Sequence, residues 1–256
     1  MDALTLFLLI GLIVFCTFTA EGISGFGSTV MALPFISMLI GVQKAVPMLS
    51  ALSIILSLFI ISRSWKSIDF REYLFIVLHV GCGVPIGLVL MDHLPKVYLL
   101  GFLIAFMFFA GIKGLISMRC KAGFQTVLPK KNFFDRAVLF CGGIIQGVFS
   151  SGGPLVIIYA SKALPEKTAF RATLTSLWLT TNCIMVTKWS LVNKVWTPEL
   201  LRIFAGSLPF IAGGMLLGNF LHNKVNQYYF KVLVYTVLLI AGMMLTCNLL
   251  KQLRVF

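Results

Sequence analysis

Charged side chains are scarce in this chain. Of its 256 residues, 11% are charged and 59% are hydrophobic, and only eight are acidic. A soluble domain typically carries about a quarter charged residues. Because so much apolar surface has no stable place in water, the composition excludes a soluble globular protein and predicts an integral membrane protein.

Patterns for redox, metal and nucleotide chemistry are also missing. The six cysteines are scattered through apolar segments without a C-x-x-C pair, which is typical of packing residues. No G-x-x-x-x-G-K-[ST] motif is present, so nucleotide hydrolysis is not expected. We therefore expect no cofactor and no metal, and any transport would be driven by ion or substrate gradients.

The scarce charges are mostly positive, with a formal net charge of +13. The basic residues lie in loops between hydrophobic runs, as the positive-inside rule predicts for a membrane protein, so this charge does not indicate nucleic acid. The expected partners are the lipid bilayer with its anionic headgroups and a small anionic substrate. The sequence leaves a homodimer open.

Long apolar runs predict the membrane-spanning helices, which need about 20 residues each. Six runs are uninterrupted, and two longer regions are broken by glycine-rich sequence. The six lie at 46–62, 72–91, 97–117, 170–188, 200–219 and 229–250, and the interrupted regions at 3–40 and 137–164. If each interrupted region crosses once, as a broken helix, there are eight crossings, whereas two crossings each would give ten.

The loop charges then predict the orientation. With eight crossings, 14 of the 21 basic residues lie on the face that also holds both termini. This bias predicts cytoplasmic N- and C-termini for a multi-pass protein of the cell inner (cytoplasmic) membrane. Ten crossings would change which loops share a face.

The two interrupted regions carry matching motifs. EGISGFGSTVMALP (21–34) aligns with QGVFSSGGPLVIIY (146–159), so that Glu21 falls on Gln146. Each motif is followed by three helices, and a basic cytoplasmic linker, 119–135, separates the halves 1–118 and 136–256. We predict an all-α membrane protein of about eight transmembrane helices in two homologous four-segment repeats, each opening with a Gly-rich broken helix. Four crossings per half would make the repeats parallel and an odd number would make them inverted.

Paired helix breaks are the best sequence indication of a transporter's substrate site. A helix that resumes after a break offers free N–H groups and its positive dipole end to an anion. The same small residues could instead serve close helix packing. The candidate substrate-binding residues are Ser24, Gly25, Gly27, Ser28, Thr29, Gln146, Ser150, Ser151, Gly152 and Gly153.

Other polar residues in the apolar segments have a functional and a structural interpretation. Glu21 and His79 are the candidates for carrying a coupling proton, although Glu21 could cap a helix and His79 could be a packing residue. Lys162 and Arg171 could attract an anion or extend to the membrane interface. Asn182 could line the pathway or hydrogen-bond between helices.

The motifs GISGFGSTVMALP and GVFSSGGPLVIIY, with the basic linker between them, resemble the TauE/SafE family of sulfite-exporter-like permeases over nearly the whole chain. The resemblance implies a secondary transporter, not an enzyme, for sulfur-containing anions such as sulfite or an organosulfonate like sulfoacetate. The substrate would be held between the two breaks and move by alternating access. Pro154 and Tyr159 stand where the first motif has Thr29 and Pro34, which leaves the substrate itself open.

The sequence also leaves other functions open. EGISGF superficially resembles a segment of undecaprenyl pyrophosphate phosphatases, which are membrane-embedded enzymes. Pyrophosphate hydrolysis needs clustered acids for a metal, and here the second repeat replaces Glu21 with Gln146. A transporter of a non-sulfur organic anion is the other alternative, and a sensor or assembly subunit is a residual one.

Overall fold

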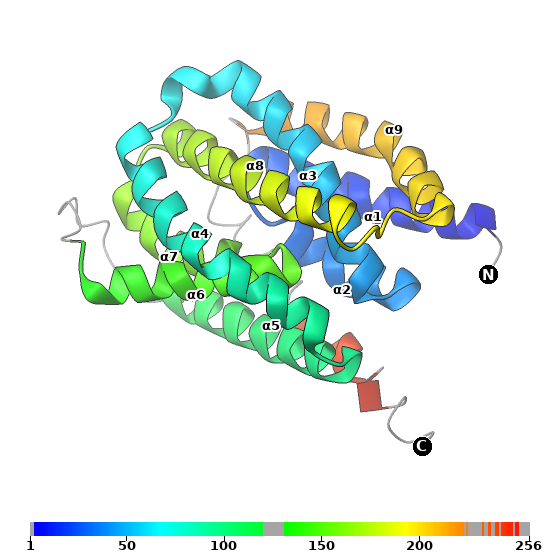
Figure 1. The fold of residues 1–256 in the computed structure, drawn as a ribbon. Coiled ribbons are helices and arrows are strands. Elements are labelled where there is room, and N and C mark those ends of the chain that lie inside the picture. The colour runs from blue at the N-terminus through cyan, green and yellow to red at the C-terminus, as the bar shows by residue number, and fades with distance from the viewer. Residues whose placement is uncertain are drawn as a thin grey trace.

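The computed structural model describes residues 3–119 and 131–222, together with 224, 232, 235–236, 239–240, 242–247 and 249–250 (Figure 1). The described part is all-helical, as predicted. Its helices are α1 (Ala3–Ser24), α2 (Ser28–Ile40), α3 (Val42–Ser64), the 3-10 turn η1 (Trp65–Ser67), α4 (Phe70–His93), α5 (Lys96–Arg119), α6 (Phe133–Phe149), α7 (Gly153–Ala163), α8 (Lys167–Leu191) and α9 (Pro198–Leu221).

Five helices of the described part are long and apolar enough to cross a membrane. They cover Thr5–Ser24, Val42–Ser67, Phe70–His93, Val97–Ile116 and Pro198–Leu221. Helix α8 is not among them, and polar residues such as Thr175, Thr181 and Asn182 are buried along it. The predicted segment 229–250 lies largely outside the described residues. The expected eight crossings are therefore not confirmed.

The second interrupted region reverses at its break and forms a helical hairpin of α6 and α7. Near the end of α7, the Lys162 Nζ atom lies 3.9 Å from the carboxylate of Asp135 in the first turn of α6. The Tyr159 hydroxyl of α7 donates a 2.6 Å hydrogen bond to Glu72 in the first turn of α4. Because α7 ends where α6 begins, this region forms a hairpin, and the expected single crossing as a broken helix is not confirmed.

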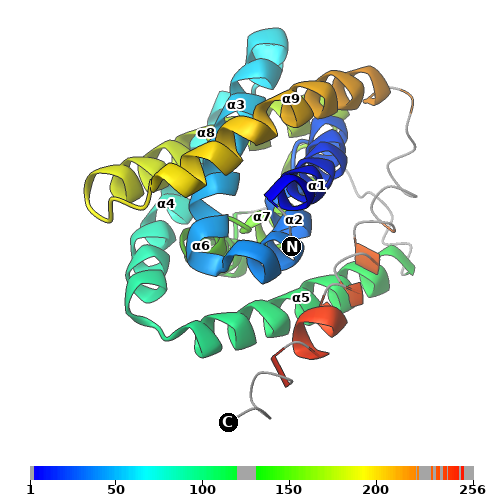
Figure 2. The same cartoon turned by 90° about the vertical axis from the view of Figure 1, so that its right-hand side faces the viewer.

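The first interrupted region also turns back, as Figures 1 and 2 show for α1 and α2. Helix α9 runs beside α1 in the same direction, since Gly206 faces Phe7 and Gly218 faces Gly22. Helix α3, which follows α2, starts near the start of α9, where the Lys44 ammonium lies 2.9 Å from Glu199. Helix α2 therefore returns toward the end of the bundle at which α1 begins.

Glycines bring each hairpin close to a helix of the other half of the chain. A methyl group added at Gly22 would lie 3.0 Å from the backbone of Gly218, so α1 and α9 nearly touch. Helices α6 and α4 meet in the same way, with Gly147 against Gly87. Small residues allow such close approach of membrane helices. The GVPIG sequence of α4 thus allows close packing of α6, and the GGMLLG sequence of α9 allows close packing of α1.

Two further helix pairs complete the described packing. Helices α3 and α8 pack against each other, with α9 against α3 and α4 against α8. Helix α5 packs against the helical residues described between 232 and 250, because methyl groups added at Gly111 and Gly242 would contact Leu239 and Phe108 respectively. These contacts show that the described residues 235–242 run antiparallel to α5. The pairs α1–α9 and α6–α4 thus flank α3–α8.

Candidate functional site

Both helix breaks are made by backbone in the left-handed region. Gly25 has φ +82° and Gly27 has φ +106°, a region in which side chains are strained. Ser150 has φ +52° at the equivalent place in the second motif. The N–H groups of Gly25 and Ser150 each donate a 2.7 Å bond four residues back, to the carbonyls of Glu21 and Gln146. The two motifs therefore end their first helices in the same way.

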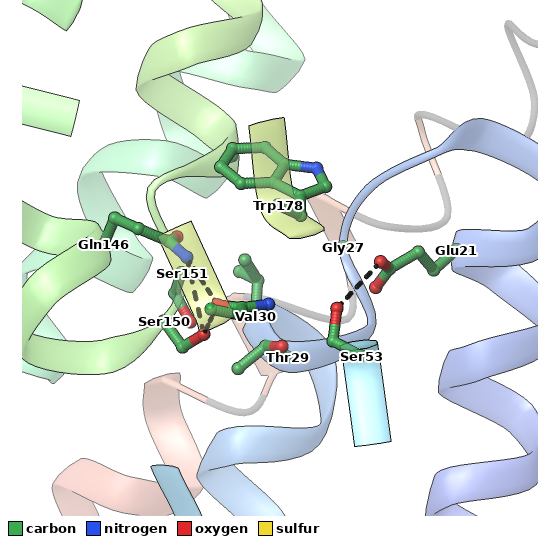
Figure 3. A pocket seen from close by; sticks show the side chains of 11 residues that line it. Glu21, Gly27, Thr29, Val30, Ser53, Gln146, Ser150, Ser151 and Trp178 are labelled. Carbon is green, nitrogen blue, oxygen red and sulfur yellow. Dashed lines mark hydrogen bonds between the residues drawn. The ribbon is translucent and has the colours of Figure 1, made fainter. Parts of the chain in front are cut away.

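The two breaks meet at one pocket (Figure 3). The second helix of each hairpin, α2 or α7, begins at this pocket. The pocket is lined by Glu21, Gly27, Thr29, Val30, Ser53, Gln146, Ser150, Ser151, Gly153, Trp178 and Asn182. Residues from both interrupted regions, which are more than a hundred positions apart in the chain, thus form one site.

Glu21 occupies one side of the pocket and is 3% exposed. Its carboxylate accepts a 3.1 Å bond from the backbone N–H of Ser28 and a further bond from the Ser28 hydroxyl. The Ser53 hydroxyl of α3 donates to its other oxygen at 3.3 Å. Glu21 thus binds the first residue of α2, where the positive end of a helix dipole favours negative charge.

Gln146 occupies the opposite side and is 1% exposed. Its carbonyl oxygen accepts a 2.9 Å bond from the N–H of Gly152, just before α7. Its amide group donates a 3.0 Å bond to Asn182 of α8, which also accepts a 2.9 Å bond from the Ser150 hydroxyl. Glu21 and Gln146, aligned in the sequence, therefore each bind the backbone at the start of a returning helix.

Helix α8 holds both breaks in place. Its Trp178 indole N–H donates a 3.0 Å bond to the carbonyl of Gly25 in the first break, and Asn182, one turn further on, binds Ser150 in the second. Both side chains line the pocket. The relative position of the two hairpin tips thus depends on two residues of one helix.

The pocket combines hydrogen-bond donors with two helix starts. The Ser28 N–H is already bonded to Glu21, and Pro154 has no N–H. The other N–H groups in the first turns of α2 and α7, those of Thr29, Val30, Gly153 and Leu155, have no partner within their own helices and are available to an anion. The hydroxyl of Thr29 lines the pocket and makes no hydrogen bond to the described residues. Among the lining residues, Glu21 is the one carboxylate. The site is therefore suited to a small oxyanion, whose charge Glu21 opposes when it is ionised.

Most of the predicted site residues lie at the pocket or shape it. Ser24, Gly25, Ser28 and Gly152 do not line it. The Ser24 hydroxyl instead donates to the carbonyl of Phe26 at 2.7 Å, within the turn. These residues form the backbone of the breaks, and the pocket wall comes from their neighbours in both motifs and from residues of α3 and α8.

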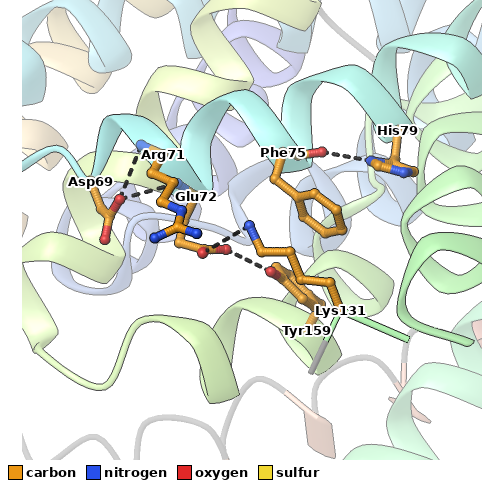
Figure 4. A network of polar contacts seen from close by, with 7 residues as sticks. All are labelled: Asp69, Arg71, Glu72, Phe75, His79, Lys131 and Tyr159. Carbon is orange, nitrogen blue, oxygen red and sulfur yellow. Dashed lines mark hydrogen bonds and ion pairs between the residues drawn. The ribbon is translucent and has the colours of Figure 1, made fainter. Parts of the chain in front are cut away.

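Three other candidates lie away from the pocket. His79 of α4 packs on the Phe75 ring, and its Nδ1 donates a 2.7 Å bond to the Phe75 carbonyl (Figure 4). Lys162 pairs with Asp135, as described above. Arg171 contacts the outer side of the first break, where a methyl group added at Gly25 would lie 2.8 Å from its Cα.

Three residues that line the pocket are not among the site residues predicted from the sequence: Val30, Ser53 and Trp178. A sequence signal for Ser53 does exist, because Ser50, Ser53 and Ser57 recur on one face of α3 and all are buried. Hydroxyl groups spaced in this way within an apolar helix indicate a face turned toward protein or a polar pocket. Trp178 had no such signal.

The comparisons with known proteins give one finding. The family model described as sulfite exporter TauE/SafE matches residues 9–245, which is nearly the whole chain. No curated protein and no solved structure matches. The matched range contains both hairpins, the pocket and all nine described helices apart from the first residues of α1. With its apolar helices, this chain is a multi-pass membrane protein that belongs to the TauE/SafE sulfite exporter family.

Proposed function

We propose that this protein is a secondary transporter that binds a small sulfur-containing anion, sulfite or an organosulfonate such as sulfoacetate, in the pocket between the two helix breaks. The observation that carries the proposal is the start of both α2 and α7 at one pocket, with hydroxyl groups from both motifs around it. Two positive helix ends and hydroxyl donors match an oxyanion. The family supports sulfur as its central atom.

The two halves, 1–118 and 136–256 with the linker 119–135 between them, form an inverted repeat in this proposal. A hairpin that begins and ends on one face does not cross the membrane. If α8 and the predicted segment 229–250 cross together with α3, α4, α5 and α9, each half has three crossings. An odd number of crossings inverts the second half relative to the first. The exchange of partners supports this arrangement, because α1 packs on α9 and α6 packs on α4.

The hairpins also change the proposed orientation. The basic residues now divide by the end of the bundle at which each loop lies, and the end where α6 begins holds 11 of the 16 basic residues in the described part of the chain. These are Arg63, Lys66, Arg71, Lys113, Arg119, Lys131, Arg136, Lys162, Lys167, Arg171 and Lys224. The positive-inside rule assigns this end to the cytoplasm. The end at which α1, α3 and α9 begin would then face the opposite side, in place of the cytoplasmic position expected from eight crossings.

Cysteine labelling tests this orientation. In a variant without the six native cysteines, Val192→Cys lies between α8 and α9 and is 71% exposed, whereas Ser67→Cys lies in η1 at the opposite end. We expect a membrane-impermeant maleimide to label Val192→Cys in intact cells and Ser67→Cys only after permeabilisation. The reverse pattern would restore the orientation derived from eight crossings.

Alternating access would require the two hairpins to move relative to each other. Each hairpin tip contacts α8, while each hairpin stem packs against a helix of the other half through glycines. The substrate would bridge the tips, so its presence changes the contacts between the two units. Glu21 is the proposed proton carrier, because an arriving anion favours its neutral form. Asn182 would line the same pathway.

Binding of the anion can be tested at Gly153, the first residue of α7. A methyl group there would lie 3.8 Å from Phe26 and Trp178, an ordinary contact that narrows the pocket without a clash. We expect Gly153→Ala to keep its melting temperature but to lose most of the thermal stabilisation that the wild type gains from sulfite or sulfoacetate. Gly101→Ala in α5, where an added methyl group meets nothing within 4 Å, is the matched control.

The panel should contain sulfite, sulfate, thiosulfate, sulfoacetate, taurine and acetate, followed by flux measurements in proteoliposomes with the ligands that bind. Stabilisation by acetate alone would favour the alternative of a non-sulfur organic anion. Equal stabilisation of Gly153→Ala and the wild type would contradict the pocket as the binding site.

A further inference from the structure

Arg171, in the second turn of α8, is buried without a counter-ion. It is 5% exposed, and none of the four ion pairs in the described part of the chain includes it. One terminal nitrogen donates a 3.2 Å bond to the side chain of Asn219, and its Nε has no hydrogen-bond partner among the described residues. Burial of an unpaired charge is strongly destabilising unless a group of opposite charge accompanies it.

None of the acidic residues in the described part of the chain forms an ion pair with Arg171. Of the eight acidic residues, Asp2 lies outside the described residues. The other seven are engaged elsewhere: Glu21 with Ser28, Asp69 with the first turn of α4, Glu72 with Lys131 and Tyr159, Asp92 with Lys188, Asp135 with Lys162, Glu166 with the first turn of α8, and Glu199 with Lys44.

Two more basic groups lie beside Arg171. The Lys167 ammonium donates to the carbonyl of His222, at the end of α9. His222 is 5% exposed, its Nδ1 donates a 2.6 Å bond to the carbonyl of Ile23, and its Nε2 has no partner in the described residues. Burial lowers the pKa of His222, and the charges of Arg171 and Lys167 lower it further, against the hydrogen bond to Ile23 and the charge of Glu166, which both raise it. The cluster thus gathers two cations and a buried imidazole near one carboxylate, that of Glu166, which accepts from the first turn of α8.

The cluster of Lys167, Arg171 and His222 lies behind the first helix break. His222 binds the carbonyl of Ile23 and Arg171 packs on Gly25, while Glu21 and Gly27 on either side of these residues line the pocket. The hairpin tip thus separates the cluster from the pocket. An anion that moved between the pocket and the end of the bundle where α8 begins would pass this cluster.

From these contacts we infer that Lys167, Arg171 and His222 form a second oxyanion-binding site, outside the pocket, at the end of the bundle where α8 begins and α9 ends. A guanidinium binds a sulfur or phosphorus oxyanion through paired hydrogen bonds, and Lys167 adds a further charge. The inference takes its ligand class from the proposed function, but the site stands on the unpaired buried cation. A free sulfur oxyanion and the phosphate of a lipid headgroup share this chemistry.

The site belongs to one half of the chain. Aligning α3 with α8 at Trp65 and Trp189 places Pro47 at the position of Arg171 and Gln43 at that of Lys167. The first half thus offers no unpaired cation equivalent to Arg171 at the opposite end of the bundle, since Lys44, next to Gln43, pairs with Glu199. A receiving site at one end only would bias the direction in which the transporter is most readily loaded.

Thermal unfolding in a neutral, lipid-free detergent tests this site. In low salt, Arg171→Gln should melt at or above the temperature of the wild type, because it removes an uncompensated buried charge. Sulfite should stabilise the wild type in two phases, and Arg171→Gln should lose one of them. Arg202→Gln, an exposed change at the start of α9, is the matched control and should keep both phases.

Lys167→Gln, at the half-buried start of α8, keeps the inference testable if Arg171→Gln does not fold. Lys167→Gln should weaken sulfite binding at least several-fold in the phase of stabilisation that Arg171→Gln loses. Loss of the other phase in Gly153→Ala, with this phase unchanged, would separate the two sites. A phase dependent on Arg171 without one dependent on Gly153 would support the second site and contradict the proposed function.

The same melting experiment with a lipid in place of sulfite identifies the source of the oxyanion. Phosphatidylglycerol in place of sulfite should stabilise the wild type but not Arg171→Gln if a headgroup phosphate occupies the site. Identical responses of the wild type, Arg171→Gln and Lys167→Gln to both sulfite and phosphatidylglycerol would overturn the inference.

Discussion

Replacement of Glu21 by glutamine should leave the protein folded and make its affinity for a sulfonate independent of pH. The second repeat shows why the fold should survive, because Gln146 accepts the backbone N–H of Gly152 as Glu21 accepts that of Ser28. In the wild type, an ionised Glu21 repels an anion in the same pocket. Affinity should therefore fall as the pH rises through the titration of Glu21 and stay constant in Glu21→Gln.

The size of this effect follows from the coupling between two ligands at one site. A coupling free energy of roughly 1–3 kcal/mol changes affinity by about 5- to 150-fold. Sulfoacetate is the better probe for this titration, because its sulfonate group keeps its charge near neutral pH whereas sulfite itself takes up a proton. Transport against a concentration gradient driven by a proton gradient should also be lost in Glu21→Gln.

Two results would decide against this role of Glu21. A wild type whose affinity for sulfoacetate does not change with pH would exclude a titrating carboxylate in the pocket. A Glu21→Gln variant with the pH dependence of the wild type would assign that dependence to another group. Glu21→Ala is the less informative change, because it leaves the Ser28 donors unpaired in a buried place.

Gly87→Ala should destabilise the protein severely, whereas Gly81→Ala in the same helix should not. A methyl group at Gly87 would overlap the carbonyl oxygen of Ile144 and lie 2.8 Å from the Cα of Gly147, so α6 would have to move away from α4. At Gly81 it would meet nothing within 4 Å. Overpacking of this kind costs about 1–3 kcal/mol or more, while the change at Gly81 should be neutral or stabilising by up to about 1 kcal/mol.

The melting temperature in detergent measures this difference. Gly218→Ala in α9 extends the test to the other hairpin, because its methyl group would lie 2.6 Å from the carbonyl oxygen of Thr19. Similar destabilisation by Gly87→Ala and Gly218→Ala would agree with two equivalently seated hairpins. If Gly87→Ala had the same melting temperature as Gly81→Ala, the close contact of α4 and α6 would be refuted.

Composition and motif pairing already determine several properties of this protein. The apolar runs predict an all-helical membrane protein because only helices satisfy their own backbone hydrogen bonds within lipid. The motifs EGISGFGS and QGVFSSGG predict the helix breaks, since Gly25 and Gly27 permit the left-handed backbone that ends α1. Eight of the candidate residues, Glu21 and Gln146 among them, line the pocket because they flank those breaks.

Only the tertiary structure decides the direction in which the chain continues after each break. A break of three residues permits either a continued crossing or a return, and hydropathy is the same in both cases. The return of α7 depends on contacts between residues distant in the sequence, such as Tyr159 with Glu72, and the close seating of α6 depends on Gly147 against Gly87. The same physical reason hides Trp178 from the sequence, because a residue on another helix joins a pocket only through the packing that brings that helix to it.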